Sequence, residues 1–396
     1  MRWPPPTRAC SSSLARSIIP TPFDPRLIWY IPPFIAQAAM DTGVARKPIL
    51  DMDAYRVHLA QRLDPTAGFL QKISGAVHRD GTKRIVFAEG EEPAVIRAAY
   101  AFQSQGLGKA ILCGRDQLVL ANMKAAGIDP EQANLQIVNA RLNERTPSYV
   151  DFLYERLQRK GFLRRDVLRL INQDRNSFAA CMLAAGDADG MVTGVTRNFD
   201  QALREVTRVI DVTPKGRLMG LSVLLSKGRT LFVADTNVTE LPDGKDLMEI
   251  AVEAASAVRR MGHTPRIAFL SYSSFGNPQG DRGDQIREAV ERLDARDDID
   301  FEYDGEMPPE LALDPSTREN YPFMRLTGPA NVLVMPGIHS AAISSKLVQA
   351  IGGATVLGPI VLGLSKPVQI CPLSASVNQV LNMAAFAAYD VRAGIE

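Results

Sequence analysis

Three short loops of small polar residues carry the side chains best suited to binding an anion. Each follows a short apolar run and precedes an amphipathic one, so we interpret each as the turn from a strand into a helix. In open α/β sheets such turns bind anions, because unpaired backbone amides and the positive end of the helix dipole meet there. The loops are Thr193–Asn198, Ser271–Pro278 and Pro336–Ala342. The alternative for each is a capped helix without a ligand.

The side chains on these loops and on the helices after them suit a phosphate. The loop that begins at Ser271 combines hydroxyl groups with a glycine, which permits close approach of the backbone to a ligand. Ser340 is a candidate helix cap, and Arg208 follows Arg204 by one helical turn. The candidate anion ligands are Arg204, Ser271, Ser273, Gly276, Asn277, His339, Ser340 and Lys346.

Two acidic groups, Glu89–Glu92 and Asp304–Glu306, are candidates for binding a cation. Each is shorter than a calcium-binding loop, so we interpret both as solvated turns. The four histidines, at positions 58, 78, 263 and 339, lack the spacing of metal ligands, and no metal site is predicted. The sequence also lacks the dinucleotide-binding, P-loop and nucleophile-elbow motifs.

The composition limits the function classes. The 396 residues include 45 Lys and Arg against 44 Asp and Glu, and a net charge of +1 argues against a nucleic-acid-binding protein. The four cysteines form no C-x-x-C pair, which fits a reducing compartment without disulfides or a zinc ribbon. No apolar run reaches the length of about 18 residues that a membrane span needs. We therefore expect a soluble, cytoplasmic protein with no membrane partner.

Short β-rich runs alternate with helical segments along the chain, and the three candidate anion-binding loops lie between them. Strands separated by helices predict parallel sheets with right-handed crossovers, and hence the α/β class. About 320 residues exceed the size of a single hydrophobic core, which predicts two sheets. Helices are expected from Pro93, over Asp200–Ile210 and over Asp246–Met261. The expected strands are Lys83–Ala88, Ala110–Cys113, Met191–Val195, Leu231–Ala234, Ile267–Tyr272, Val332–Met335 and Val356–Leu364.

Four segments, read together, resemble the phosphate acetyl/butyryltransferase family. They are K-R-I-V-F-A-E-G-E-E-P-A-V-I-R-A-A from Lys83, D-A-D-G-M-V-T-G from Asp187, Y-D-G-E-M from Tyr303 and the long run Lys346–Val368. The resemblance covers the chain from about residue 75 to its end. It implies a two-lobed α/β fold of parallel sheets, similar to that of isocitrate and isopropylmalate dehydrogenases. By that pattern, residues 75–215 and 358–396 form the first lobe, residues 216–357 form the second, and the ligand binds between them.

The segment before this region carries a second resemblance. The sequence I-I-P-T-P-F-D-P-R-L-I-W-Y-I-P-P from Ile18, with D-M-D-A-Y-R from Asp51, is similar to the end of the catalytic part of bacterial malic enzymes and its linker. The chain thus resembles the C-terminal portion of a hybrid NADP-dependent malic enzyme. We expect an irregular lead over residues 1–17 and a tail and linker helix over residues 18–74, broken at Pro65. The resemblance places malate, NADP and divalent-metal binding upstream of Ile18, so no cofactor is expected in this chain.

The transferase motif of that family is altered near the C-terminus. Active phosphotransacetylases resemble K-P-V-x-x-L-S-R-G, where Ser and Arg contact the substrates and a later Asp acts as the base. Here Pro372 and Leu373 stand in place of the Ser and Arg, and Gln379 stands in place of the Asp. Leucine binds no anion, and glutamine accepts no proton from a thiol. No catalytic residue is therefore assigned.

The resemblance assigns the remaining anion-binding groups to an acyl-CoA site. Arg204 and Lys346 match family positions, and Arg159 and Lys160 lie in a basic segment near the CoA phosphates, where Leu157 replaces the family arginine and Arg156 is a further substitute. We expect an acetyl-CoA-binding regulatory domain that acts allosterically within a homo-oligomer. An active acyltransferase and a structural oligomerisation module with a vestigial pocket are the alternatives.

Overall fold

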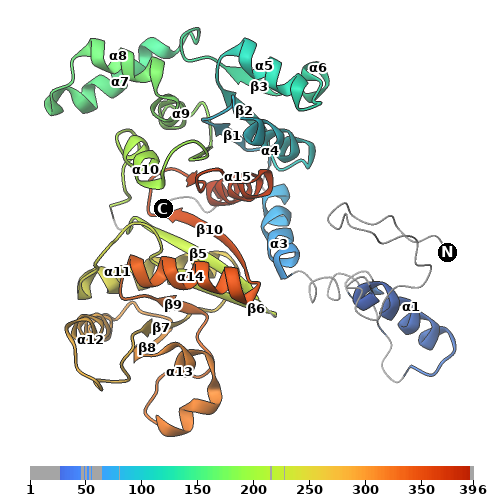
Figure 1. Ribbon diagram of the computed structural model, residues 1–396, viewed down its shortest axis with the longest axis vertical. Coiled ribbons are helices and arrows are strands. Elements are labelled where there is room, and N and C mark those ends of the chain that lie inside the picture. Colours follow the sequence, from blue (N-terminus) through green and yellow to red (C-terminus); the bar gives the residue numbers. More distant parts are fainter. Residues whose placement is uncertain are drawn as a thin grey trace. The chain divides into compact units, whose positions relative to one another are not determined.

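The chain divides into two compact units, Met1–Gly68 and Phe69–Glu396. In the first unit, the helix α1 (Leu27–Asp41) contains Pro32 and Pro33. The expected irregular lead, and most of the tail before residue 65, lie outside the described residues. The computed structural model describes residues 27–45, 49, 51–52, 55, 65–79, 81–214, 216–226 and 228–392 (Figure 1).

The first sheet of the second unit has five strands in the order β11-β4-β1-β2-β3, all parallel. The strands are β1 (Arg84–Phe87), β2 (Lys109–Cys113), β3 (Gln136–Val138), β4 (Gly190–Thr193) and β11 (Val368–Ile370). Successive residues of a strand point to opposite faces, so Ile85 and Phe87 enter one core while Val86 enters another. Three of these strands, β1, β2 and β4, overlap the expected runs, whereas β3 and β11 were not expected.

Helices cover both faces of this sheet. One face packs on α4 (Pro93–Ser104), α15 (Val377–Arg392) and the part of α3 (Pro65–Arg79) from Phe69 onward, around the ring of Phe102. Pro93 begins α4 as expected, since the first helical position needs no amide donor. The other face packs on α7, α8, α9 and α10 around Tyr149 and Phe178. The remaining helices of this lobe have the bounds α5 (Asp116–Ala125), α6 (Pro130–Ala133), α7 (Thr146–Leu157), η1 (Gln158–Lys160), α8 (Arg164–Gln173), α9 (Arg175–Ala184) and α10 (Phe199–Thr207).

The second sheet has six strands in the order β10-β5-β6-β9-β7-β8. Its strands are β5 (Met219–Ser226), β6 (Arg229–Ala234), β7 (Arg266–Leu270), β8 (Glu302–Met307), β9 (Val332–Val334) and β10 (Thr355–Leu362). The expectation of purely parallel sheets was wrong here, because β10, β5 and β6 pair antiparallel. The strand β5 was missed, since a continuous apolar run buried on both faces has no alternation to reveal it.

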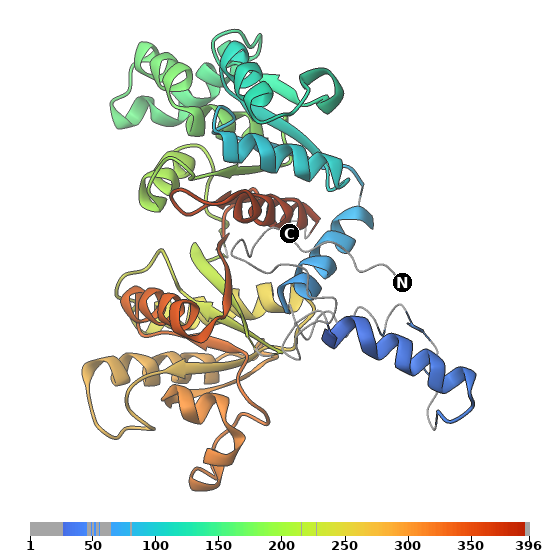
Figure 2. The same cartoon turned by 45° about the vertical axis from the view of Figure 1, so that its right-hand side comes forward.

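The helices of the second sheet are α11 (Gly244–Arg260), α12 (Asp281–Asp294), α13 (Pro309–Leu313), η2 (Pro315–Asn320) and α14 (Ile338–Gly352). As predicted, α11 buries Leu247, Ile250, Ala254 and Val258 on one side. The chain returns to the first sheet through β10 and β11, and α15 then packs against α4 (Figure 2). Position 358, where the first lobe was expected to resume, falls inside β10. Every helix of the described part of the chain is too short or too polar to span a bilayer.

We predict that Gly194→Ala destabilises the fold by about 2 kcal/mol or more. Gly194 has a φ of +108°, and an added Cβ would lie 2.4 Å from the carbonyl oxygen of Cys371. The methyl group would therefore push apart the ends of β4 and β11. Urea denaturation would measure the loss of unfolding free energy.

The matched control for this prediction is Gly127→Ala. Gly127 also has a positive φ, of +76°, but no atom lies within 4 Å of a Cβ added there. Its substitution should cost only the backbone strain, about 1 kcal/mol. Equal losses for the two variants would contradict the predicted clash between the added methyl group and the carbonyl oxygen of Cys371.

Candidate functional site

The loop from β4 into α10 holds a carboxylate of the protein itself. Glu89 is 2% exposed, and its side chain accepts hydrogen bonds from the amides of Val195 at 2.6 Å and Thr196 at 3.0 Å. The hydroxyl of Thr196 donates to it at 2.5 Å. The prediction that Glu89–Glu92 forms a solvated turn was wrong, because the chain folds this turn under neighbouring loops where its carboxylates find donors.

The loop from β7 into α12 also surrounds an internal carboxylate. The hydroxyl of Ser273 and the amide of Gly276 donate to Glu306 at 3.0 and 2.9 Å, and Ser271 contacts the Ser273 hydroxyl at 2.9 Å. Arg287 pairs with the same carboxylate at 2.6 Å. Asp304–Glu306 lies inside β8, with Glu306 fully buried, so this expected solvated turn was also wrong. Ser273 and Gly276 therefore already bind an anion, the carboxylate of Glu306, and Ser271 contacts it only through Ser273.

The remaining residues proposed near the second sheet lie at its surface. Asn277 is exposed within this loop. His339 is exposed on α14 and lies 3.5 Å from the carboxylate of Glu240. Ser340 does not cap α14, because Gly337 is the N-cap residue and the Ser340 hydroxyl donates to the Gly337 carbonyl at 3.1 Å. Lys346 is exposed, and no ion pair joins it to another described residue.

The basic groups of the first lobe come together at one end of α10. Arg159 and Lys160 are exposed in η1, which follows the helix α7 that carries Arg156. Arg156 forms an ion pair with Asp211 at 2.6 Å and donates to the Arg208 carbonyl at 3.4 Å. Its hydrogen bond holds the pKa of Asp211 below the ordinary value. The structure thus joins the end of α7, which leads into η1, to residues 208 and 211 just after α10, and Arg204 is exposed on α10.

A cavity of about 320 Å³ opens between α8 and α10 beside this basic cluster. Three arginines and three carboxylates line it, so its lining is electrically balanced. Arg197 pairs there with both Asp174 and Glu205. Within the described residues, the side chains of Arg169 and Arg208 form no ion pair. Its lining residues are Phe162, Asp166, Arg169, Leu170, Gln173, Asp174, Arg197, Gln201, Glu205 and Arg208.

Sequence reasoning placed Arg197 within a candidate anion-binding loop but did not predict its pairing with Asp174, and it missed Arg169, which belongs to no motif. The available signal was Asp174, an acid at the start of α9 that caps the helix through the amides of Asn176 and Ser177. A capping acid holds a nearby cation in place, as it holds Arg197. No cluster of His, Cys, Asp and Glu suited to a metal ion occurs among the described residues.

The loop from β11 into α15 provides neither a base nor an anion clamp. Leu373 is 56% exposed and apolar. The side-chain oxygen of Gln379 accepts from the amide of Ser376 at 2.9 Å, and the Ser376 hydroxyl accepts from the Gln379 amide at 3.4 Å. These two residues form a reciprocal helix cap. Burial and the nearby Glu89 carboxylate raise the pKa of the Cys371 thiol, so Cys371 is not a nucleophile at neutral pH.

Comparisons with known proteins match the part of the chain that contains both sheets. A family model described as phosphate acetyl/butaryl transferase matches residues 68–388. The NADP-dependent malic enzyme of Rhizobium meliloti is 55% identical over 373 residues, which cover 94% of this chain and 49% of that protein. A probable NADP-dependent malic enzyme of Rickettsia prowazekii is 43% identical over 94% of this chain and 50% of its own length. The chain thus spans about half the length of these relatives.

Among solved structures, a phosphotransacetylase from Streptococcus pyogenes superposes with a TM-score of 0.77. Its sequence is 25% identical, and the match covers 83% of this chain and 99% of that one. The likeness therefore extends over both sheets, which are the parts that hold the loops described above.

We predict that Gln379→Ala lowers the unfolding free energy by about 1 kcal/mol, because it removes one half of the helix cap. Thermal and urea denaturation would measure the change. Asn378→Ala, at an exposed neighbouring position, is the control and should have little effect. Equal stability of both variants would show that Gln379 does not cap α15.

Proposed function

The chain belongs to the phosphate acetyl/butaryl transferase family, and we propose that it uses the family fold to bind an acyl-CoA rather than to transfer an acyl group. This membership confirms the family indicated by the sequence motifs. The similarity to malic enzymes confirms the second resemblance, to the C-terminal part of those proteins.

The loop between β11 and α15 carries the argument against transfer. Acyl transfer from acyl phosphate to CoA needs a base for the thiol and a cation for the phosphoryl oxygens. Here the side chain of Leu373 is a hydrocarbon and provides no cation. The side chain of Gln379 is an amide that caps a helix, and it provides no base. Loss of such groups typically removes several kcal/mol of transition-state stabilisation.

The basic cluster at the end of α10 supports binding. Arg159 and Lys160 follow α7, whose Arg156 contacts residues 208 and 211 just after α10; Arg204 lies on α10, and Arg208 also lines the cavity between α8 and α10. Guanidinium groups bind phosphate oxygens through paired charge-assisted hydrogen bonds. We assign the CoA phosphates to this cluster and acetyl-CoA as the first ligand to test.

We further propose that acyl-CoA binding regulates malate oxidation in a protein that contains both parts. Relatives that match 94% of this chain are named as malic enzymes, and this chain spans about half of their length. A ligand regulates a distant site only when it binds one arrangement of the protein more tightly than another. A contact between subunits is the simplest element with two such arrangements.

The helix α14 offers a surface for a second copy of the chain. Ile343, Leu347, Val348 and Ile351 are 42–80% exposed and lie on one side of the helix. An uncharged apolar stripe of this length is self-complementary when two copies meet about a two-fold axis. We propose that this face forms the homodimer interface.

The first prediction from this function concerns turnover and binding. Mixing the chain with acetyl phosphate and CoA should give no acetyl-CoA above background, whereas acetyl-CoA alone should raise the melting temperature, since ligand binding stabilises the folded state. Arg204→Gln and Arg208→Gln should each weaken acetyl-CoA binding about tenfold in calorimetry.

Arg165→Gln is the control for these variants, because Arg165 is an arginine on α8 that is 79% exposed and lies outside the cavity. Rapid acetyl-CoA formation would show an active transferase. An unchanged melting temperature at millimolar acetyl-CoA would favour a purely structural module with a vestigial pocket.

A second prediction concerns the oligomer. Ile351→Glu should convert a dimer into a monomer, because it places a charge in the apolar contact. Gln349→Glu, on the opposite side of α14, should leave the dimer intact. Sedimentation velocity would decide, and a wild-type monomer, or a dimer that survives Ile351→Glu, would contradict the proposed interface.

A further inference from the structure

A second cavity, of about 290 Å³, lies at the carboxyl ends of β1, β2 and β3. None of the residues assigned to acyl-CoA binding lines it. Its walls come from the turn after β1, the turn after β2, the loop after β3, and the junction of α8 with α9. The lining residues are Glu91, Cys113, Gly114, Arg115, Val138, Asn139, Ala140, Arg141, Ile171, Asn172, Gln173, Arg175 and Phe178.

Glu91 holds one wall of this cavity in place. It is buried, and it accepts from the backbone amide and the Nε of Arg115 at 2.9 and 3.0 Å. Arg175 forms an ion pair with its other oxygen. Burial opposes its ionisation, but the hydrogen bonds and charges of Arg115 and Arg175 hold the pKa of Glu91 below its ordinary value. Gly114 allows this approach, because a Cβ there would lie 2.8 Å from the Glu91 side chain.

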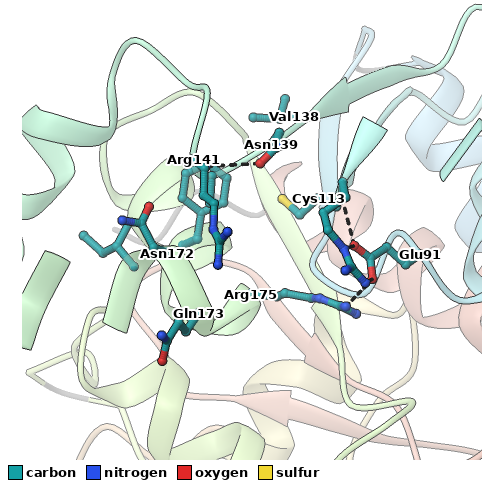
Figure 3. Close-up of a pocket in the computed structure, with 13 residues that line it drawn as sticks. Glu91, Cys113, Val138, Asn139, Arg141, Asn172, Gln173 and Arg175 are labelled. Atoms are coloured by element: carbon teal, nitrogen blue, oxygen red, sulfur yellow. Dashed lines mark hydrogen bonds and ion pairs between the residues drawn. The ribbon is translucent and has the colours of Figure 1, made fainter. Parts of the chain in front are cut away.

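The opposite wall is built by Asn139 and Arg141. Asn139 donates to Asp116 at 2.9 Å and accepts from the Arg141 amide at 3.2 Å, which fixes the loop after β3. Figure 3 shows the Arg141 side chain between Asn172 on one side and the pair of Glu91 and Arg175 on the other. Within the described residues, the Arg141 guanidinium has no hydrogen-bond or ion-pair partner.

The lining carries an excess of positive charge. Three arginines face a single carboxylate, which gives a net charge of +2. Burial raises the pKa of the Cys113 thiol to about 12, so this cysteine adds no negative charge at neutral pH. Glu91 binds Nε and one terminal nitrogen of Arg115, and one terminal nitrogen of Arg175. Each guanidinium therefore keeps donors for a ligand.

A polar group in the same wall lacks a partner. The side-chain oxygen of Asn172 is buried, and no donor in the described part of the protein reaches it. An unsatisfied buried acceptor is costly, so a ligand hydroxyl that bonds the Asn172 amide would be favoured. The cavity thus combines cationic donors with an amide suited to an uncharged polar group.

We propose that this cavity binds a small phosphate monoester that carries hydroxyl groups. Its three arginines come from three separate segments. A phosphate monoester has three terminal oxygens and can accept hydrogen bonds from all three arginines, whereas a carboxylate has only two oxygens. A phosphate dianion also matches the net charge of the lining. The Asn172 amide would bind a hydroxyl of the same ligand. This cavity shares Gln173 with the cavity beside α10, but none of the basic residues assigned to acyl-CoA lines it, and the proposal goes beyond that function.

Calorimetry of the full chain at low salt, with glycerol 3-phosphate as the probe, tests this proposal. We expect saturable binding, weaker binding of inorganic phosphate, and none of glycerol. Succinate, a dicarboxylate, should bind more weakly than glycerol 3-phosphate. Equal binding of succinate, or no saturable binding of glycerol 3-phosphate, would overturn the assignment of a phosphate ligand.

Substitutions of the lining residues test whether glycerol 3-phosphate binds in this cavity. Arg141→Gln, at an exposed position, should raise the dissociation constant for glycerol 3-phosphate about tenfold to a hundredfold, and Arg165→Gln should not change it. Asn172→Leu should remove the preference for glycerol 3-phosphate over inorganic phosphate. Unchanged binding in Arg141→Gln would place the ligand elsewhere and refute the proposal.

Binding measurements with acetyl-CoA distinguish this phosphate site from the proposed acyl-CoA site. Arg141→Gln should bind acetyl-CoA like the wild type, and acetyl-CoA should not displace glycerol 3-phosphate. Displacement, or loss of acetyl-CoA binding in Arg141→Gln, would show a single shared site and overturn the separate one. Binding of glycerol 3-phosphate by a chain that does not bind acetyl-CoA would support this cavity and refute only the acyl-CoA function.

Discussion

Buried carboxylates determine the geometry of the loops at the carboxyl ends of the strands. Glu89, Glu91 and Glu306 are each at most 5% exposed, and each is surrounded by backbone amides, hydroxyls or arginines. Removing a carboxylate from water without partners would cost several kcal/mol, so these contacts must all form together. The loops that supply the donors are consequently fixed in one conformation. Three loops that look independent in sequence are thus tied to acids far away along the chain.

This constraint decides where a ligand can bind. The loops after β4 and β7 have the amides and hydroxyls expected for a phosphate, but Glu89 and Glu306 already use them. A second anion beside either carboxylate would be repelled. Anion binding is favoured instead where guanidinium groups outnumber carboxylates, as around Arg141, or where they stay unpaired, as at Arg208.

The sequence predicted the strands and helices better than it predicted the site. Short apolar runs followed by amphipathic segments were sufficient to place β1, β2, β7 and α11, because local periodicity encodes them. The burial of Glu91 depends instead on Arg115 and Arg175, which lie 24 and 84 residues later. Composition made its turn look solvated, since nothing local indicates that other loops cover it. Arg141 and Asn172 were missed for the same reason.

The cap formed by Ser376 and Gln379 also limits what a carboxylate at position 379 could do. A carboxylate introduced at position 379 would be a good acceptor for the Ser376 amide and would stand in the first turn of α15, where the helix dipole favours the charged form. Both effects lower a carboxylate pKa and make it a weaker base. Leu373 would still provide no cation for a phosphoryl group. Under the proposed function, catalysis would require several simultaneous changes in this loop, whereas ligand binding would require none, because the basic groups of α10 belong to a different element.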